Sequence, residues 1–310
     1  MKNTELDNPK NSLVLFEFKD ILNNLINLIK LKRFPKVLML SGKKGIGKYT
    51  LVNHLLTHIF DQDNYDLVNR TISNNTKFYN LNKENLHPSI IYLSGSIHKN
   101  IKVEDIRKLK SKILKSSLSN EERFLVFDDI ELFNQNSLNA LLKIIEEPKV
   151  KDSFILINNE TKNLIKTIYS RSIEIKLFLS NSSRVKIIEN LLYKFNQSVL
   201  IDYKSINITP GNFFLFNDIC NVNQINIDEN FIVNFELILD IYKKNKDMNY
   251  INFLLFYTEY YFSKIKKKTY SVESVLNNRI FVLTNINKFV NNSLNQNSLK
   301  QIINDKLFNG

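Results

Sequence analysis

The chain has few of the residues that form covalent cross-links or sharp turns. Its 310 residues include one cysteine, no tryptophan, five prolines and six glycines. The single cysteine, Cys220, excludes an internal disulfide and any zinc site built from several cysteines. No apolar run is long enough to span a membrane, and residues 1–11 lack the apolar core of a signal peptide. We therefore expect a cytoplasmic protein with no zinc, no metal-ligating cluster and no membrane partner.

Acidic residues are in the minority. The chain carries 31 Asp and Glu against 43 Lys and Arg, so its formal net charge is +12. Asn, Lys, Ile and Leu are abundant while Ala and Gly are scarce, a bias that drift of the coding DNA explains. The lysine excess is therefore only a weak indicator of nucleic-acid binding. His54 and His58 have i,i+4 spacing without an acidic partner beside them, which favours packing over metal ligation.

Three of the six glycines fall within one eight-residue stretch that ends at Tyr49. An apolar run, Val37–Leu40, precedes this stretch, and an amphipathic run from Leu51 to Phe60 follows it. A strand that enters a glycine-rich turn at the start of a helix lets backbone N–H groups surround phosphate oxygens. The spacing matches the G-x-x-x-x-G-K pattern of a phosphate loop. The candidate nucleotide-binding residues here are Gly42, Gly45, Gly47 and Lys48.

The next position departs from the phosphate-loop pattern. A Ser or Thr hydroxyl that binds Mg²⁺ belongs there, and the chain has Tyr49. Thr50 is a poor substitute because one further helical residue turns its side chain by about 100° away from the metal. We include both residues in the candidate nucleotide site. The pattern indicates a nucleotide-hydrolysing fold in which one part of the hydrolytic site is altered.

A pair of acidic residues follows a second apolar run. Phe124–Phe127 leads directly into Asp128 and Asp129. In phosphate-loop folds the first acid of such a pair holds the water shell of the magnesium ion, and the second, normally Glu, polarises the attacking water. Asp129 is one methylene shorter than Glu, about 1.5 Å less reach, which predicts slow hydrolysis. A solvated turn after the strand is the alternative, and the phosphate loop argues against it.

The first half of the chain alternates apolar runs with helical patterns, which predicts a parallel sheet covered by helices. Residues 61–87 are polar, rich in Asn and not assigned. Expected strands are Val37–Ser41, Ile90–Leu93, Phe124–Phe127, Phe154–Ile157 and Ile173–Leu177. Expected helices are one that includes Val103 to Leu114, one from about Asn136 to Glu147 and one over about Lys162–Tyr169.

After Leu177 the pattern becomes helical. We expect Asn181-Ser182-Ser183 to cap a helix and Pro210-Gly211 to mark a break. Further helices are expected near Phe231–Lys244, Tyr250–Lys264, Val272–Asn291 and Leu299–Leu307. This organisation predicts an α/β domain over residues 1–178, a small helical domain over 179–222 and a terminal helical domain over 223–310.

Several motifs resemble those of clamp-loader AAA+ subunits, in family order and over most of residues 37–211. The run Asn139–Pro148, N-A-L-L-K-I-I-E-E-P, resembles a helix of that family, and Phe154–Asn159 is similar to its sensor-one strand. Ser170-Arg171-Ser172 resembles the S-R-C motif that supplies an arginine finger to a neighbouring subunit. Further resemblances are Ile101–Arg107 at a helix start, His87-Pro88 before the second strand and Pro210-Gly211 in the lid domain.

The resemblance implies an AAA+ P-loop domain with a parallel five-stranded sheet, a small helical lid domain and an all-α C-terminal collar domain. It adds Asn159 to Asp128 and Asp129 as nucleotide-binding residues and gives Arg171 a catalytic role in the neighbouring site. Among the family, the chain looks most like the delta-prime subunit, a largely non-hydrolysing stator. Tyr49 and Asp129 fit that reading. ATP or ADP with Mg²⁺ is then expected to bind weakly or not at all.

The partners that the resemblance implies are gamma/tau motor subunits, the delta subunit, the sliding clamp and primer-template DNA, contacted through its phosphates. One alternative is an active gamma/tau-type clamp-loader ATPase, which the intact Gly47-Lys48 favours. A second alternative is a nucleotide-sensing P-loop module unrelated to replication, against which the Asn139–Pro148 helix argues.

Overall fold

The computed structural model describes residues 9–96, 122–146, 148, 150–265, 271–292 and 295–308. Contacts divide the chain into two compact units. The first comprises Met1–Leu191 with Thr209–Asn212, and the second comprises Leu192–Ile208 with Phe213–Gly310. The helix expected over Val103–Leu114 lies outside the described residues, as does Glu147. The division into three domains stays a prediction.

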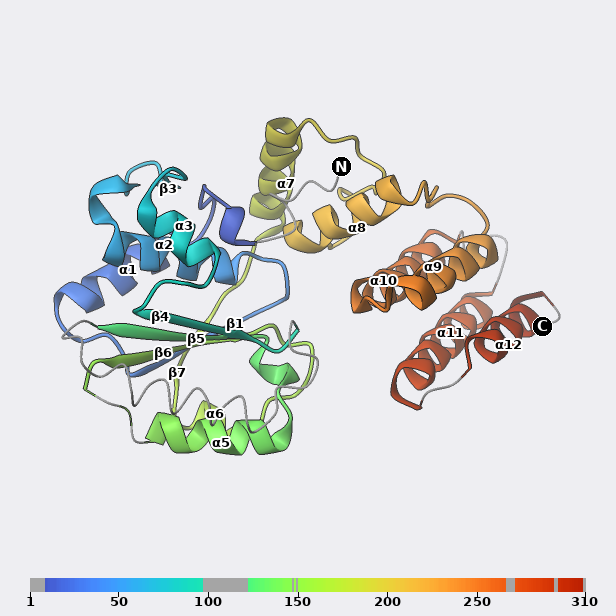
Figure 1. Ribbon diagram of the computed structural model, residues 1–310. Helices are drawn as coiled ribbons and strands as arrows, with labels where there is room; N and C mark the ends of the chain where they lie inside the picture. The colour runs from blue at the N-terminus through green and yellow to red at the C-terminus, as the bar shows by residue number, and fades with distance from the viewer. Residues whose placement is uncertain are drawn as a thin grey trace. The chain divides into compact units, whose positions relative to one another are not determined.

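A five-stranded sheet forms the centre of the first unit (Figure 1). The strand order is β4-β5-β6-β1-β7, and every neighbouring pair is parallel. This sheet confirms the predicted α/β fold class and all the expected strands. The strands are β1 (Val37–Ser41), β4 (Ile90–Ser94), β5 (Arg123–Asp128), β6 (Asp152–Asn158) and β7 (Ile173–Lys176).

Helices cover both faces of this sheet, and the alternation of side chains along each strand explains why (Figure 1). Phe124 and Val126 of β5 belong to the apolar core on one face, while Leu125 and Phe127 belong to the core on the other. Both faces are therefore buried, which is why the strands read as continuous apolar runs. One face is covered by α1 (Lys19–Lys30), α2 (Lys48–Phe60) and α3 (Lys77–Lys83), and the other by α5 (Gln135–Glu146) and α6 (Lys166–Tyr169).

The segment that the sequence left unassigned forms short elements. A 3₁₀ turn, η2 (Gln62–Asn64), leads into an antiparallel hairpin of β2 (Tyr65–Asp66) and β3 (Thr71–Ile72). Helix α3 follows, capped by Thr76, whose Oγ1 accepts from the Tyr79 N–H at 3.1 Å. Strands of two residues are too short to show a period in the sequence. Across the described part of the chain, no group of His, Cys, Asp and Glu side chains is arranged to hold a metal ion.

Some boundaries differ from those expected. Helix α6 begins at Lys166 and not near Lys162, because Ile165 has an extended backbone (φ −67°, ψ 141°) that no helix can include. Helix α7 (Asn181–Phe195) is capped by Ser180, whose Oγ accepts from the Ser183 N–H at 3.0 Å. Pro210 does not break the chain but begins α8 (Pro210–Val222). Proline suits the first turn of a helix, where its missing N–H has no partner to lose.

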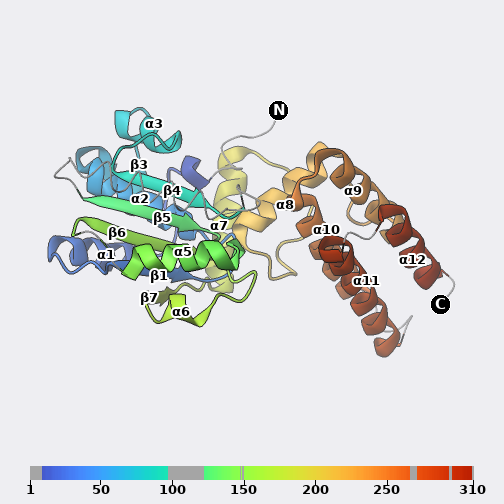
Figure 2. The same ribbon diagram turned by 60° about the horizontal axis from the view of Figure 1, so that its bottom comes forward.

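The second unit is helical, as predicted (Figure 2). Helix α9 packs against α10 and α12, and α11 packs against α10 and α12. Their shared core is aromatic; for example, the rings of Phe231 and Tyr257 stack with centroids 5.5 Å apart. Among the described helices, none is long and apolar enough to cross a membrane. The helices are α9 (Phe231–Asn245), α10 (Met248–Lys264), α11 (Val272–Asn292) and α12 (Gln296–Phe308).

A buried ion pair joins the first residues of β5 and β6. Arg123 and Asp152 are 5% and 1% exposed, and the Arg123 guanidinium donates to Asp152 Oδ1 at 2.8 Å and 2.6 Å. Removing Asp152 takes away the buried carboxylate that the Arg123 guanidinium faces, and breaking a buried pair of this kind is costly. The pair therefore stabilises the register between β5 and β6, in which Arg123 lies opposite Asp152.

We expect Asp152→Ala to lower the free energy of unfolding by about 3–5 kcal/mol. Glu146→Ala is the matched control, because Glu146 forms an exposed ion pair with Arg171 in the same unit. Exposed pairs contribute about 0–1 kcal/mol, so this control should change little. Urea unfolding followed by circular dichroism measures both variants. Equal losses in the two would show that burial of the Arg123–Asp152 pair has no energetic weight.

Candidate nucleotide-binding site

The phosphate loop has a backbone that only glycine adopts without strain at three positions. Gly42, Gly45 and Gly47 have φ values of 152°, 84° and 100°. A Cβ added to Gly42 would lie 2.4 Å from the Leu177 carbonyl oxygen, and one added to Gly45 would lie 2.6 Å from Thr209 Oγ1. Gly47 is the N-cap of α2. The loop therefore has the tight conformation that the glycine spacing predicted.

The start of α8 holds the carbonyl groups of this loop. Thr209 Oγ1 donates to the Lys44 carbonyl oxygen at 2.7 Å, and the Gly211 N–H donates to the Gly45 carbonyl oxygen at 2.9 Å. A Cβ on Gly211 would lie 2.8 Å from Gly45 Cα, so two glycines are needed where these backbones meet. Sequence reasoning did not find Thr209, since nothing local to it indicates a partner in a loop far along the chain.

Lys48 begins α2 and is 3% exposed. Its Nζ donates to the Lys43 carbonyl oxygen at 2.8 Å and to the Gly42 carbonyl oxygen. Burial lowers the Lys48 pKa to about 8, against the raising influence of nearby carboxylates, of which Asp128 has the largest effect. The ammonium group therefore lies at the loop, where the phosphate-loop lysine is expected.

Asp128 ends β5 and is buried. Its Oδ1 accepts from the backbone N–H of Asp129 at 2.8 Å, and its Oδ2 accepts from the Tyr92 hydroxyl at 3.0 Å. Burial and, to a smaller extent, the negative charge of Asp129 raise the Asp128 pKa to about 6, while the Tyr92 hydrogen bond opposes both. The ordinary value is 3.8. Asp128 is thus a buried acid that depends on donors from neighbouring residues.

Asp129 and Asn159, which follow β5 and β6, meet at the same edge of the sheet. Asn159 Nδ2 donates to Asp129 Oδ1 at 2.8 Å and lies 3.4 Å from Asp128 Oδ1. Lys44 Nζ lies 3.3 Å from the same Asp129 oxygen. Asp129 adopts a left-handed backbone (φ 49°, ψ 44°) at the start of a 3₁₀ turn, η3 (Ile130–Leu132). Both acids and Asn159 are therefore brought together, as the resemblance implied.

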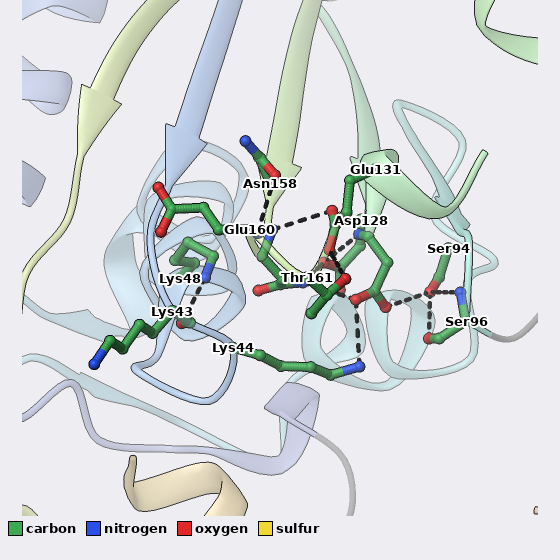
Figure 3. A network of polar contacts seen from close by, with 12 residues as sticks. Lys43, Lys44, Lys48, Ser94, Ser96, Asp128, Glu131, Asn158, Glu160 and Thr161 are labelled. Atoms are coloured by element: carbon green, nitrogen blue, oxygen red, sulfur yellow. Dashed lines mark hydrogen bonds and ion pairs between the residues drawn. The ribbon is translucent and has the colours of Figure 1, made fainter. Parts of the chain in front are cut away.

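Glu131 supports this edge of the sheet and was missed by sequence reasoning. Its Oε2 accepts from the Asn159 N–H at 3.1 Å, and its Oε1 accepts from Thr161 Oγ1 at 2.7 Å (Figure 3). Glu131 is buried in η3, two positions after Asp129. It positions the Asn159 backbone, so that the amide of Asn159 can reach the acid pair.

The Tyr49 side chain is packed into the core, although its position in the phosphate loop normally carries a magnesium-binding hydroxyl. It is 7% exposed and belongs to the apolar core around α2. Its ring meets that of Tyr92 edge-on, with centroids 5.1 Å apart, and burial raises the pKa of its hydroxyl. Thr50, in the next position of α2, is half-buried. Among the described residues, no hydrogen bond joins Thr50 to the acid pair, and its role at the nucleotide site stays a prediction.

Arg171 is not part of this cluster. It follows α6, is exposed, and its guanidinium pairs with Glu146 of α5 at 2.7 Å. It also donates to the Thr167 carbonyl oxygen and to Ser170 Oγ, at 3.2 Å each. These contacts place Arg171 on the surface of the unit, where a finger that reaches into a neighbouring subunit must lie. Its catalytic role stays a prediction.

A family model described as "DNA polymerase III, delta subunit" matches residues 18–180, which is more than half of the chain. The chain belongs to this family. The match spans the phosphate loop, the acid pair, Asn159 and Arg171, so every candidate site residue lies within it.

Relatives carry two different subunit names. DNA polymerase III subunit gamma of Buchnera aphidicola subsp. Acyrthosiphon pisum is 28% identical over 186 residues, which are 59% of this chain and 47% of that protein. The chain thus spans about half the length of this relative. DNA polymerase III subunit delta' of the same organism is 24% identical over 225 residues, 72% of this chain and 66% of that protein. A solved gamma subunit-related protein of Thermotoga maritima is 15% identical over 91% of each chain, with a TM-score of 0.40.

In this member of the family, the phosphate-binding residues of the site fit a magnesium nucleotide better than the metal-binding residues do. The loop and Lys48 fit a phosphate group, since the glycine backbone and the cation are in place. The residues expected to hold Mg²⁺ do not fit it. Tyr49 is packed into the core, and the lone pairs of Asp128 are partly taken by the Tyr92 hydroxyl on Oδ2 and the Asp129 N–H on Oδ1.

We expect Tyr92→Phe to raise the pKa of Asp128 above about 6, because it removes the donor that favours the ionised carboxylate. Carboxyl-carbon NMR of aspartate-labelled protein measures this titration. The raised pKa means that the stability contributed by Asp128 is complete below pH 3.8 and is lost as the pH rises through about 6. The variant should move the upper end of this window to higher pH.

Tyr65→Phe is the control for this titration, since the Tyr65 hydroxyl bonds to His54 and not to the acid pair. It should leave the Asp128 titration where it is. An unchanged Asp128 titration in Tyr92→Phe would show that the Tyr92 hydroxyl does not stabilise the carboxylate.

Proposed function

We propose that this chain is the delta-prime subunit of a DNA polymerase III clamp loader, a stator that hydrolyses ATP very slowly or not at all. One observation carries the proposal: Tyr49 stands where the magnesium-binding hydroxyl belongs and is packed against Tyr92 in the core. Family membership and the delta' relatives support it. In this role the chain completes the active site of a neighbouring ATPase subunit with Arg171.

The second acid supports the same conclusion. A water-polarising carboxylate has to reach the attacking water with a free oxygen. Asp129 is shorter than Glu, its Oδ1 is engaged by Asn159 and Lys44, and the Ser94 hydroxyl lies 3.4 Å from its Oδ2. Its left-handed backbone, set by η3, fixes this direction. Slow hydrolysis thus has two independent causes, one at Tyr49 and one at Asp129.

The purified chain should therefore turn over ATP far more slowly than about 1 per second, the lower end of the range typical of phosphoryl-transfer enzymes such as kinases. A steady-state assay of phosphate release from the isolated protein measures this rate. Lys48→Ala protein serves as the control for contaminating ATPases. Turnover at motor rates that Lys48→Ala abolishes would favour an active gamma/tau-type subunit instead.

The arginine-finger role is compatible with the contacts of Arg171. Its ion pair with Glu146 has exposed fractions of 38% and 45%, and such exposed pairs contribute little to stability. The guanidinium can therefore exchange Glu146 for the phosphate of a nucleotide held by a neighbour at small cost. A planar fork binds phosphate oxygens through two parallel hydrogen bonds, which a lysine ammonium does not provide.

In a reconstituted complex, Arg171→Ala should stop hydrolysis at the site that faces this chain, because fingers contribute about 10³–10⁵ in rate. Total ATPase activity then falls in part, while gel filtration shows a complete assembly. Arg171→Lys should rescue poorly. The measurement is DNA- and clamp-stimulated ATPase activity.

Glu146→Ala separates this role from a structural one. If Arg171 acts only through its ion pair with Glu146, then Glu146→Ala removes the same interaction and lowers activity equally. If Arg171 is a finger, Glu146→Ala leaves the ATPase activity intact. Equal activity of the wild-type and Arg171→Ala complexes would contradict the finger role.

We further propose the gamma/tau motor subunits, the delta subunit, the sliding clamp and primer-template DNA as partners. The helical second unit would contribute to a collar with sister subunits. Val272, Leu276 and Ile280 support this, since they form an i,i+4,i+8 stripe on α11 and are 59%, 46% and 52% exposed. An exposed apolar stripe of this kind suits packing against a partner helix.

The alternative is an active gamma/tau-type ATPase. It is favoured by the complete glycine loop with Lys48 and by the similarity to a gamma subunit. Tyr49 and Asp129 argue against it for the reasons given above. The ATPase assay of the isolated chain distinguishes the two subunit types.

A further inference from the structure

Magnesium has strict requirements at a nucleotide site. It takes oxygen ligands in near-octahedral geometry at about 2.0–2.1 Å and keeps several of its waters. In phosphate-loop proteins a hydroxyl at the start of the helix and an acid at the end of a neighbouring strand hold the ion and its waters. Both positions have to offer free lone pairs directed at the same small volume.

Asp128 offers its oxygens only in competition with donors of the protein itself. Its Oδ1 accepts from the Asp129 N–H, and its Oδ2 accepts from the Tyr92 hydroxyl at 3.0 Å. The second donor comes from the neighbouring strand β4. A hydrated cation at Asp128 would have to share the carboxylate with this hydroxyl, which competes with the cation for Oδ2.

The tyrosine that makes this bond is held from two further directions. The Tyr49 ring packs edge-on against it at 5.1 Å, and the ammonium group of Lys10 lies 4.8 Å from its ring centroid. Lys10 is itself buried and donates to the Asn82 carbonyl oxygen at 2.8 Å. Tyr92 therefore does not swing aside without disturbing residues of η1 (Pro9–Asn11), α2 and α3.

Positive charge is nevertheless present at the site. Lys44 Nζ lies 3.3 Å from Asp129, and Lys48 is held against the carbonyl groups of the loop. Both ammonium groups belong to the same glycine-rich segment, next to the N-terminus of the 13-residue helix α2. Two lysines and the helix dipole supply part of the positive charge that Mg²⁺ brings to a phosphate chain.

We propose that the phosphate loop binds a nucleoside di- or triphosphate as the metal-free anion, with Lys44 and Lys48 on the phosphates and the Tyr49–Tyr92–Asp128 contact in place of the metal. This deepens the stator function proposed above and rests on it for the class of ligand. In this arrangement the loop holds the phosphates while no metal ion is bound, so nucleotide binding does not lead to hydrolysis.

The test compares binding of a fluorescent ADP analogue to the full-length chain in excess Mg²⁺ and in excess EDTA. The inference predicts saturable binding that is at least as tight in EDTA as in Mg²⁺. Lys48→Ala should weaken binding about equally under both conditions. Binding that is about tenfold or more tighter in Mg²⁺, a difference of about 1.4 kcal/mol, would overturn the inference. A lack of saturable binding in both conditions would overturn it as well.

Two variants test directly whether the Tyr49–Tyr92–Asp128 contact takes the place of the metal ion. Tyr92→Phe keeps the ring and removes the hydroxyl, and Tyr49→Ser combined with Tyr92→Phe also restores a hydroxyl at the metal position. Tighter binding in Mg²⁺ than in EDTA should appear in the double variant and, to a smaller extent, in Tyr92→Phe. Tyr92→Phe is nearly isosteric, so it remains informative if the double variant does not fold. A folded Tyr92→Phe protein whose binding ratio between the two conditions equals that of the wild type would overturn the role of Tyr92.

Failure of this inference is distinguishable from failure of the proposed function. If nucleotide does not bind, the effect of Arg171→Ala on the neighbouring ATPase still tests the stator role by itself. If Arg171→Ala has no effect while metal-independent binding is observed, the binding result stands and the role in the complex is lost.

Discussion

The buried carboxylate of Asp128 is the constraint around which the site is organised. A charged group inside a protein is tolerated only when hydrogen-bond donors surround it. Here the donors come from the neighbours of β5 on both sides: Tyr92 lies on β4, and Asn159 directly follows β6. Only a parallel sheet brings the carboxyl ends of all these strands to one edge. The position of one acid thus depends on the register of three strands.

The strand order sets what the phosphate loop touches. Because β1 lies between β6 and β7, the loop that follows it is packed between the ends of these strands. The Gly42 N–H donates to the Asn158 carbonyl oxygen at 3.2 Å, and the Leu177 carbonyl leaves no space for a side chain at Gly42. Lys44, two positions further along the loop, can then extend to Asp129. The loop and the acid pair are therefore parts of one packing arrangement.

The sequence predicted what depends on local pattern. Each central strand is a continuous apolar run, because both faces of the sheet are covered, and the loop is recognisable by its glycines. Asn159 and Arg171 were located by resemblance to a family and not by any local rule. Tyr92, Glu131 and Thr209 were missed because their partners are distant in the chain; Thr209 and Lys44, for example, are 165 positions apart. The Tyr65–Ile72 hairpin was missed because its strands are too short to show a period.

The glycines of the loop have a structural reason to be glycine whether or not the protein hydrolyses ATP. Gly42 is confined by Leu177, and Gly45 is confined by Thr209 and Gly211 at the start of α8. Replacing either one would push the loop against backbone or a short side chain that has little room to move. A complete glycine pattern is therefore weak support for catalysis in this chain. The second residue of α2 is more informative, because its helical backbone accepts many residue types and the chain places there Tyr49, whose ring packs into the core beside Tyr92. This side chain, and not the glycine pattern, is what favours the proposed binding without hydrolysis.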